Sequence, residues 1–166
     1  MSNVKSTLTA ERLREVFQYS EETGFFTWRI SVNSRSPIGG VAGTIRGKGY
    51  IGISIDGTIY YAHRLAWLYV HGCWPLGQID HRDGNRKNNR IANLRNVTPR
   101  QNSQNLTRAR KGAAGGLLGA NKHGNRWTAH IRIDGHRKHL GSFATAELAH
   151  EAYVKAKREL HSGCTI

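Results

Sequence analysis

The chain has 166 residues, which is enough for one ordinary domain or two small ones. It carries 25 Lys and Arg against 11 Asp and Glu, a formal net charge of +14 at neutral pH. Such an excess argues against a neutral enzyme and predicts binding to a polyanion, nucleic acid first, with an affinity that falls as salt rises. A basic protein that merely adheres to polyanions has the same composition, so motifs must decide.

The two cysteines, Cys73 and Cys164, stand far apart and outside any paired motif. They predict neither a disulfide framework nor a cysteine-based structural zinc site, and a reducing cytoplasm is the expected compartment. No apolar run approaches the length of a membrane span, and the N-terminus lacks the apolar core of a signal peptide. We expect no membrane contact, and no obligate protein partner is evident.

The N-terminal part of the chain predicts short helices alternating with short strands. Thr9 can cap a helix over residues 8–19, with Leu13, Val16 and Phe17 as its buried stripe. Asp56-Gly57 is a strong hairpin signal. The other expected elements are a helix over 63–71 and strands over 25–30, 41–45, 50–55 and 58–61.

The segment 78–105 is rich in His, Asp and Asn and interleaved with Arg and Lys. Residues 94–97 can form a second short strand after the one that carries Asp80-His81. Thr98 can then cap a helix, with Pro99 at its first position and Gln101 completing a capping box. The expected local order is strand, loop, strand, helix.

Four elements of this segment occur together and in order: Asp80-His81, Asn-Asn-Arg at 88–90, Asn93-Leu94 and a late Asn102. Together they resemble the HNH (ββα-metal) motif of phage and intron-encoded nucleases, and the likeness covers most of residues 8–106. The resemblance implies a metal-dependent DNA endonuclease, of the free-standing homing type found in phages. The chain differs from many HNH proteins in having no paired cysteine knuckles, so no structural zinc is expected.

Hydrolysis of a phosphodiester needs a water nucleophile, a base to deprotonate it and a cation to neutralise developing charge. His81 is the candidate base, since a neutral imidazole is available near pH 7. The resemblance makes Asp80 and Asn102 the oxygen ligands of a divalent cation, Mg²⁺ first or else Mn²⁺, and no other cofactor is expected. It gives Asn93 the role of bracing the loop and orienting His81.

Asp80 and His81 are adjacent, and a regular strand would point them to opposite faces. The site therefore requires either irregular backbone there or a phosphate held between the two side chains. Asp83 is expected to serve a turn, and His63 to be structural or to touch phosphate. Contact with DNA phosphate, rather than a merely solvated surface, is expected of Arg82, Arg86, Lys87 and Arg90.

The C-terminal part predicts strands over 126–133 and 137–143 and a helix over 146–160 capped by Thr145. Residues 115–162 resemble an AP2 (ERF-like) domain, in which a three-stranded sheet packs on one helix and lies in the major groove. The resemblance makes this a DNA-reading module. Trp127 is left open between core and DNA contact, while DNA contacts are expected at Arg126, Arg132, Arg137 and Lys138.

The predicted fold class is α+β: an HNH nuclease domain over 1–106 with its ββα-metal core at about 76–106, a basic Gly-rich linker over 107–117, and an AP2-like domain over 118–166. The predicted partner is double-stranded DNA. The predicted location is the cytoplasm, that of the host cell if the chain is phage-encoded. Two alternatives remain: a non-catalytic DNA-binding regulator with an inert HNH segment, and a nuclease directed at RNA or at particular DNA structures.

Overall fold

The computed structural model describes residues 8–31, 36–104, 109, 112–161 and 164. The chain forms two compact units, residues 1–97 and 98–166, and each is described by itself. The helix α3 (Pro99–Gln104) therefore groups with the second unit, whereas the sequence predicts it as part of the first domain, over 1–106. The linker expected over 107–117 lies partly outside the described residues, so its limits stay a prediction.

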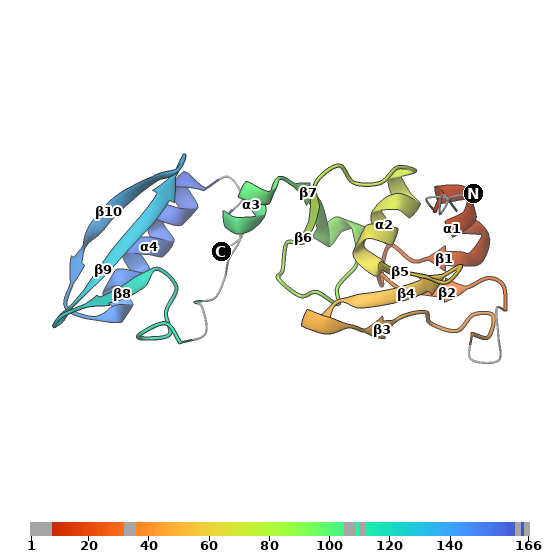
Figure 1. Cartoon of the computed structure of the whole chain (residues 1–166), viewed down its shortest axis with the longest axis horizontal. Coiled ribbons are helices and arrows are strands. Elements are labelled where there is room, and N and C mark those ends of the chain that lie inside the picture. Colours follow the sequence, from red (N-terminus) through yellow and green to blue (C-terminus); the bar gives the residue numbers. More distant parts are fainter. Residues whose placement is uncertain (1–7, 32–35, 105–108, 110–111, 162–163, 165–166) are drawn as a thin grey trace, which may run out of the picture. The chain divides into compact units, whose positions relative to one another are not determined.

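In its described residues, the first unit has two α-helices, two short 3-10 helices and three small antiparallel sheets, whose orders are β1-β2, β3-β4-β5 and β6-β7 (Figure 1). The helix α1 packs on α2, and α2 packs on β4 and β5. The element bounds are α1 (Ala10–Val16), β1 (Phe17–Tyr19), β2 (Phe26–Trp28), β3 (Thr44–Ile45), η1 (Gly47–Gly49), β4 (Ile51–Ile55), β5 (Thr58–Tyr61), α2 (Ala62–His71), β6 (Gln78–His81), η2 (Ile91–Asn93) and β7 (Leu94–Val97).

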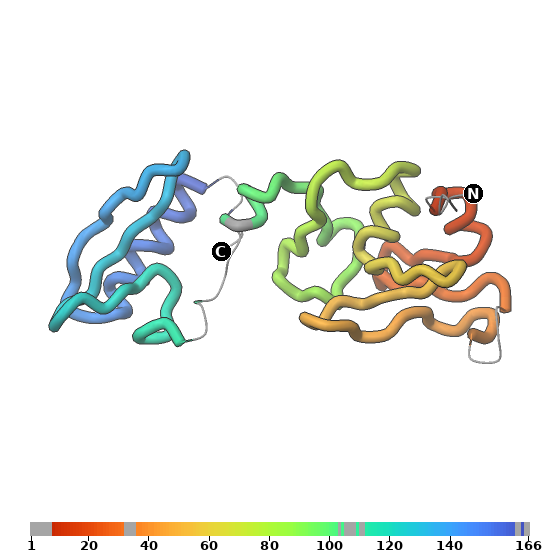
Figure 2. Tube along the Cα trace, in the orientation of Figure 1, coloured from red at the N-terminus to blue at the C-terminus, as the bar shows by residue number. Residues whose placement is uncertain are grey.

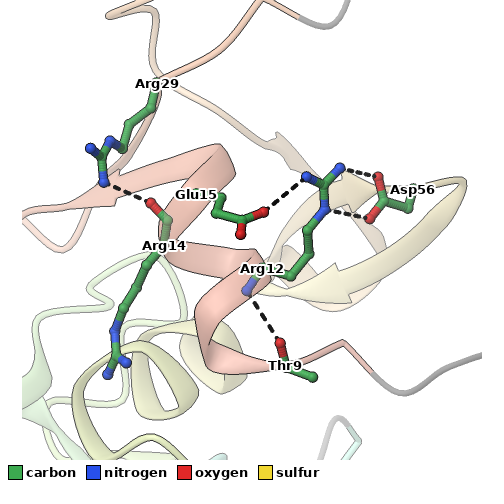
Figure 3. Close-up of polar contacts among 6 residues, drawn as sticks. All are labelled: Thr9, Arg12, Arg14, Glu15, Arg29 and Asp56. Carbon is green, nitrogen blue, oxygen red and sulfur yellow. Dashed lines mark hydrogen bonds and ion pairs between the residues drawn. The ribbon is translucent and has the colours of Figure 1, made fainter.

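The first helix is shorter than the sequence predicted. Thr9 caps α1 as expected, because its side chain accepts a hydrogen bond from the Arg12 backbone N at 3.2 Å (Figure 3). The helix nevertheless ends at Val16, and β1 pairs with β2. Phe17 and Tyr19 are buried while Gln18 is exposed, which is the two-residue period of a strand rather than the period of a helix. The prediction of a helix through residue 19 is wrong.

The exposed side of α1 is tied to the β4–β5 turn by ion pairs (Figure 3). Arg12 donates from Nε and Nη2 to the two carboxylate oxygens of Asp56 at 3.1 and 3.0 Å, and its Nη1 lies 3.2 Å from Glu15. Asp56 and Gly57 have φ of 46° and 76°, so the predicted tight hairpin turn is confirmed. Exposed pairs of this kind contribute less than about 1 kcal/mol each, so burial carries the stability of the unit.

The core of the first unit lies between the two helices and the strands β1, β2 and β4. Leu13, Phe17 and Leu65 are completely buried, and Phe26 and Ile53 are 1% exposed. The helix α2 ends at Gly72, whose φ of 73° is the left-handed conformation expected of a glycine cap. This core holds the N-terminal hairpin and α2 against the segment that follows α2.

The second unit is a three-stranded antiparallel sheet of order β10-β9-β8 with α4 packed on one face (Figures 1 and 2). Its elements after α3 are β8 (Ala120–His123), β9 (Arg126–Ile133), β10 (His136–Phe143) and α4 (Ala146–Leu160). Thr145 caps α4 as predicted, accepting from the Leu148 backbone N at 3.4 Å. Trp127 packs with Ala120, Ala129 and Tyr153, so this ring belongs to the core and not to the outer face.

No described helix combines the length and the apolar character needed to cross a bilayer.

Candidate functional site

Asp80 and His81 lie on β6, which pairs with β7 in regular register: Asp80 is opposite Arg95 and His81 is opposite Leu94. The two side chains therefore point to opposite faces, and the irregular backbone considered for this pair is not found. Arg95 donates from Nε and Nη2 to Oδ2 of Asp80 at 2.9 and 2.8 Å. The Arg95 and Asp80 side chains are only 17% and 11% exposed, so the carboxylate is held firmly in one place.

His81 is buried, at 4% exposure, and one of its ring nitrogens is engaged. Nε2 lies 3.1 Å from Oδ1 of Asn89, which is itself 2% exposed. Because an amide oxygen only accepts, Nε2 carries the ring proton and Nδ1 is the basic nitrogen. Burial lowers the pKa of His81, against a smaller opposing effect of the Asn89 hydrogen bond. The neutral, base-competent form is therefore favoured at neutral pH.

Asn93 clamps the loop between β6 and β7. Its Nδ2 donates to Oδ1 of Asp83 at 3.0 Å and to the Asn88 carbonyl at 2.8 Å, and its Oδ1 accepts from the Asp83 backbone N at 3.1 Å. Asp83 also accepts from Asn88 Nδ2 at 2.7 Å and from the Asn85 backbone N at 2.8 Å. These bonds outweigh burial and lower the pKa of Asp83. Asp83 thus acts as a turn residue, and the clamp fixes the stretch that leads to Asn89.

The β1–β2 hairpin contacts the backbone at Asn89 and Arg90. The Tyr19 hydroxyl donates to the Asn89 carbonyl at 2.7 Å, and burial raises the pKa of Tyr19 to about 12, so this donor keeps its proton. Gly24 has a φ of 74°, and a Cβ added there would stand 2.5 Å from the Arg90 backbone N and 2.6 Å from the Asn89 carbonyl carbon. The backbone at 89–90 can approach this turn so closely only because residue 24 is glycine.

Gly24→Ala is therefore expected to displace the backbone that carries Asn89 and to destabilise the first unit. Gly57→Ala is the matched control, since Gly57 has a φ of 76° and nothing within 4 Å of an added Cβ. Both variants suffer the left-handed penalty of roughly 1–2 kcal/mol. Gly24→Ala should lose about 1–3 kcal/mol more through overpacking. Urea unfolding followed by tryptophan fluorescence measures the difference, and equal losses would contradict this account.

His63, at the start of α2, packs edge-on against His81 with ring centroids 5.2 Å apart. The Tyr61 ring stacks on the His63 ring with the centroids 5.6 Å apart, and the Tyr50 ring centroid lies 5.1 Å from that of His63. Burial lowers the pKa of His63 to about 3, so this ring is neutral at any working pH. Its Nδ1 is buried with no hydrogen-bond partner. His63 is thus a buried residue that packs against His81, which fits the structural role, one of the two roles expected of it.

The four basic residues expected at phosphate all lie on the loop between β6 and η2, and all are exposed: Arg82, Arg86, Lys87 and Arg90. Arg86 donates from Nη1 to the Lys48 carbonyl at 2.6 Å, and its guanidinium lies 5.0 Å from the Tyr50 ring centroid. The loop therefore presents positive charge beside His81. Contact of these residues with phosphate stays a prediction.

A divalent cation such as Mg²⁺ would need oxygen ligands at this site. Within the described ranges, no group of three or more His, Cys, Asp and Glu side chains lies close enough to hold a metal ion. Mg²⁺ does not need such a cage, because it retains waters and binds one or two carboxylates with substrate oxygens. The nearly buried carboxylate of Asp80 fits that requirement. Asn102 lies on α3, in the other compact unit, so its part in the site stays a prediction.

The face of the second sheet opposite α4 carries basic side chains. Arg126 and Arg132 lie on β9 at positions that alternate with the core residues Trp127, Ala129 and Ile131. Arg137 is opposite Arg132 and shares that outer face, whereas Lys138 is opposite Ile131 and so belongs to the helix side. Three of the four residues expected to read DNA therefore share one face, and Lys138 does not.

Sequence reasoning missed two close partners of the motif residues. Arg95 could have been found, because the predicted strands 78–81 and 94–97 place it opposite Asp80 once they pair as a hairpin. Asn89 gave no such signal, since its contact with His81 depends on the path of the intervening loop.

Comparisons with known proteins identify the family of the chain. Residues 60–104, which include α2, the β6–β7 hairpin and α3, match the family model described as HNH endonuclease. The chain is also 32% identical over 102 residues to Protein 3.8 of Escherichia phage T7, an alignment that covers 60% of this chain and 83% of that protein. The chain belongs to the HNH endonuclease family.

A solved structure of the HNH homing endonuclease I-HmuI, described as showing DNA binding and cleavage, is also similar. Its sequence identity is 24%, and the alignment covers 89% of this chain and 88% of that chain. The TM-score is 0.41, which is too low to carry an argument about this chain.

Proposed function

We propose that this chain is a divalent-metal-dependent endonuclease that hydrolyses phosphodiester bonds in double-stranded DNA. The observation that carries the proposal is His81: a buried, neutral imidazole whose Nε2 is held by Asn89 and whose Nδ1 is left as the basic nitrogen. This ring lies beside a loop whose Arg82, Arg86, Lys87 and Arg90 are exposed, which suits a base that acts on a polyanion.

In this proposal His81 removes a proton from the attacking water through Nδ1, and Asn89 and the Asn93 clamp keep the ring in position. Asp80 and Asn102 would hold Mg²⁺ or Mn²⁺, with Asn102 assigned from the motif alone. The cation, when bound, supplies the positive charge that neutralises the scissile phosphate. Asp80 and His81 point to opposite faces, so the phosphate would have to lie between them at the end of β6.

The direct test is supercoiled plasmid incubated with the purified full chain in Mg²⁺ or in EDTA. The proposal expects nicked or linear products in Mg²⁺ and none in EDTA. Cleavage that is insensitive to chelator would remove the metal from the proposal. Cleavage of single-stranded RNA with the plasmid left intact would favour the RNA-directed alternative.

Asn89→Leu should lower kcat by about 10²-fold with little change in KM, because the imidazole loses the acceptor that fixes its tautomer. Asn89→Asp retains an acceptor oxygen and should recover most of the rate. Single-turnover cleavage of both variants measures the effect, with thermal unfolding as the check on folding. If the cleavage rates of the two variants differ only as their thermal stabilities do, Asn89 has a structural role and no role in positioning the base.

We propose further that the second unit supplies affinity and register through the outer face of its sheet, in the manner of an AP2-like domain. The support is the shared exposed face of Arg126, Arg132 and Arg137, and the absence of Asp and Glu from β8, β9 and β10. A compact nuclease site touches too few bases to specify a long target, so a separate reader is useful.

Arg126→Ala and Arg132→Ala should each relax the choice of cut site. If either side chain reads a guanine edge, its loss costs about 1–3 kcal/mol at one base pair, while the chemical step is unchanged. Lys138→Ala, on the helix side of the sheet, is the matched control and should keep the site preference. Mapping cut sites on a long DNA measures all three. An identical cut-site map for both Arg variants would reassign this face to another role.

We include in the proposal a homing-type role, which rests on the motif resemblance alone, and the cytoplasm of a host cell as the location, because one relative is a phage protein. The alternative is a non-catalytic regulator that binds DNA through both units. A chain that binds duplex DNA but never cuts it, with any divalent cation, would favour that alternative.

A further inference from the structure

Three side chains on the outer face of the second sheet form one hydrogen-bonded line. Nη2 of Arg137 lies 3.1 Å from Nδ1 of His130, and Nε2 of His130 lies 3.0 Å from Nδ1 of His139. His130 and His139 are directly opposite each other on β9 and β10, and their ring centroids are 4.7 Å apart. None of these contacts takes part in the proposed nuclease chemistry.

The direction of every hydrogen bond in this line follows from its first member. A guanidinium only donates and does not lose its proton in proteins, so Nδ1 of His130 is an acceptor. A neutral His130 then carries its proton on Nε2, which donates to Nδ1 of His139. His139 must in turn carry its proton on its own Nε2, the ring nitrogen that points away from His130.

His130 must be neutral for this order to hold, since a doubly protonated ring could not accept from Arg137. Desolvation lowers the pKa of His130, and the positive charge of Arg137 lowers it further. The neutral form therefore dominates near pH 7. The tautomers of both histidines are fixed by Arg137.

The surroundings of His139 suit a polyanion. It is exposed on β10, an outer strand of the sheet, while α4 covers the opposite face. The neighbouring outer-face residues Arg126 and Arg132 are exposed and basic, and the three strands contain no acidic residue. Charge complementarity thus favours duplex DNA over a neutral or basic partner.

We infer that Arg137 and His130 are positioning residues that hold the Nε2–H of His139 as a hydrogen-bond donor toward an acceptor atom of duplex DNA. The acceptor is either a purine N7 or guanine O6 in the major groove, or a phosphate oxygen. This inference rests on the proposed reading of DNA by the second unit. Without Arg137 the His130–His139 bond can run in either direction, and His139 is no longer a fixed donor.

The first measurement is the ¹⁵N chemical shifts of the imidazoles in the full chain without DNA. The inference expects a protonated Nε2 and an unprotonated Nδ1 in both histidines, and Arg137→Met should mix the tautomers. Nδ1 protonated in His130 of the parent chain would overturn the inference whatever the chain does with DNA.

The second measurement is selection of bound duplexes from a pool with a randomised central segment, using the full chain and its variants His139→Ala, Arg137→Met and Arg132→Met. If the acceptor is a base, the first two variants lose preference at the same base pair, by about tenfold, and Arg132→Met retains it. If the acceptor is a phosphate, His139→Ala weakens retention of all duplexes alike, and Arg137→Met weakens it more than Arg132→Met does.

Two outcomes separate the failure of this inference from the failure of the proposed function. An unchanged motif and affinity in His139→Ala, beside a weakened Arg132→Met, would overturn the donor role alone. A parent chain that retains no duplex would overturn DNA reading by the second unit, and the donor role with it.

Discussion

His81→Ala is expected to lower the rate of DNA cleavage by about 10²–10⁴-fold while leaving DNA affinity nearly intact. The imidazole acts on the attacking water, whereas affinity comes from dispersed contacts of basic side chains with phosphate. Single-turnover cleavage beside a gel-shift titration in EDTA measures the two quantities separately. Full activity in the variant would remove His81 from the chemistry.

His71→Ala is the matched control for this experiment. His71 is the last residue of α2, it is exposed, and its ring packs on the Trp67 ring with the centroids 4.1 Å apart. Its loss should leave cleavage at the parent rate. A comparable fall in both variants would point to damage of the fold and not to loss of a base.

Asp80→Asn is expected to lower cleavage by a similar factor, on the order of 10²–10⁴, because the cation loses its charged ligand. Asparagine retains an oxygen that can accept from Arg95, so the β6–β7 pair should stay folded. The dependence of the rate on Mg²⁺ concentration should move to higher concentration. Thermal unfolding checks that the fold survives.

The control is Asp56→Asn, because Asp56 also receives two hydrogen bonds from one arginine but lies in the exposed β4–β5 turn. This variant should cut DNA at the parent rate and with the parent Mg²⁺ dependence. A parent-like Mg²⁺ dependence in Asp80→Asn would exclude Asp80 as a ligand.

Much of the local structure could be predicted because its signals lie within a few residues. The capping box after β7 is one case: the Thr98 backbone N donates to the Gln101 side chain at 3.0 Å, and the Gln101 backbone N donates to Thr98 Oγ1 at 3.2 Å. The turn at Asp134-Gly135 is another, with φ of 49° and 86°. Such patterns depend on backbone chemistry alone and need no knowledge of the tertiary fold.

The errors and omissions occurred where tertiary packing decides. Leu13, Val16 and Phe17 fit a helical stripe, yet Phe17 lies outside the helix, in the β1–β2 pair, where it is completely buried. Asn89 could not be singled out among several asparagines, because only the folded loop brings its side chain to His81. The hydrogen-bonded line of Arg137, His130 and His139 was missed for a related reason. Strand alternation shows that side chains share a face but not which of them touch.

The most direct test of the central claim is to bind the full chain to duplex DNA in EDTA, isolate the complex, and then add Mg²⁺ in excess. The account predicts that bound DNA stays intact until Mg²⁺ arrives and is then cut within the complex, with the His81→Ala complex left uncut. Bound DNA that survives Mg²⁺ and Mn²⁺ in the parent complex would contradict the account, and the chain would then be a binder with an inert HNH segment.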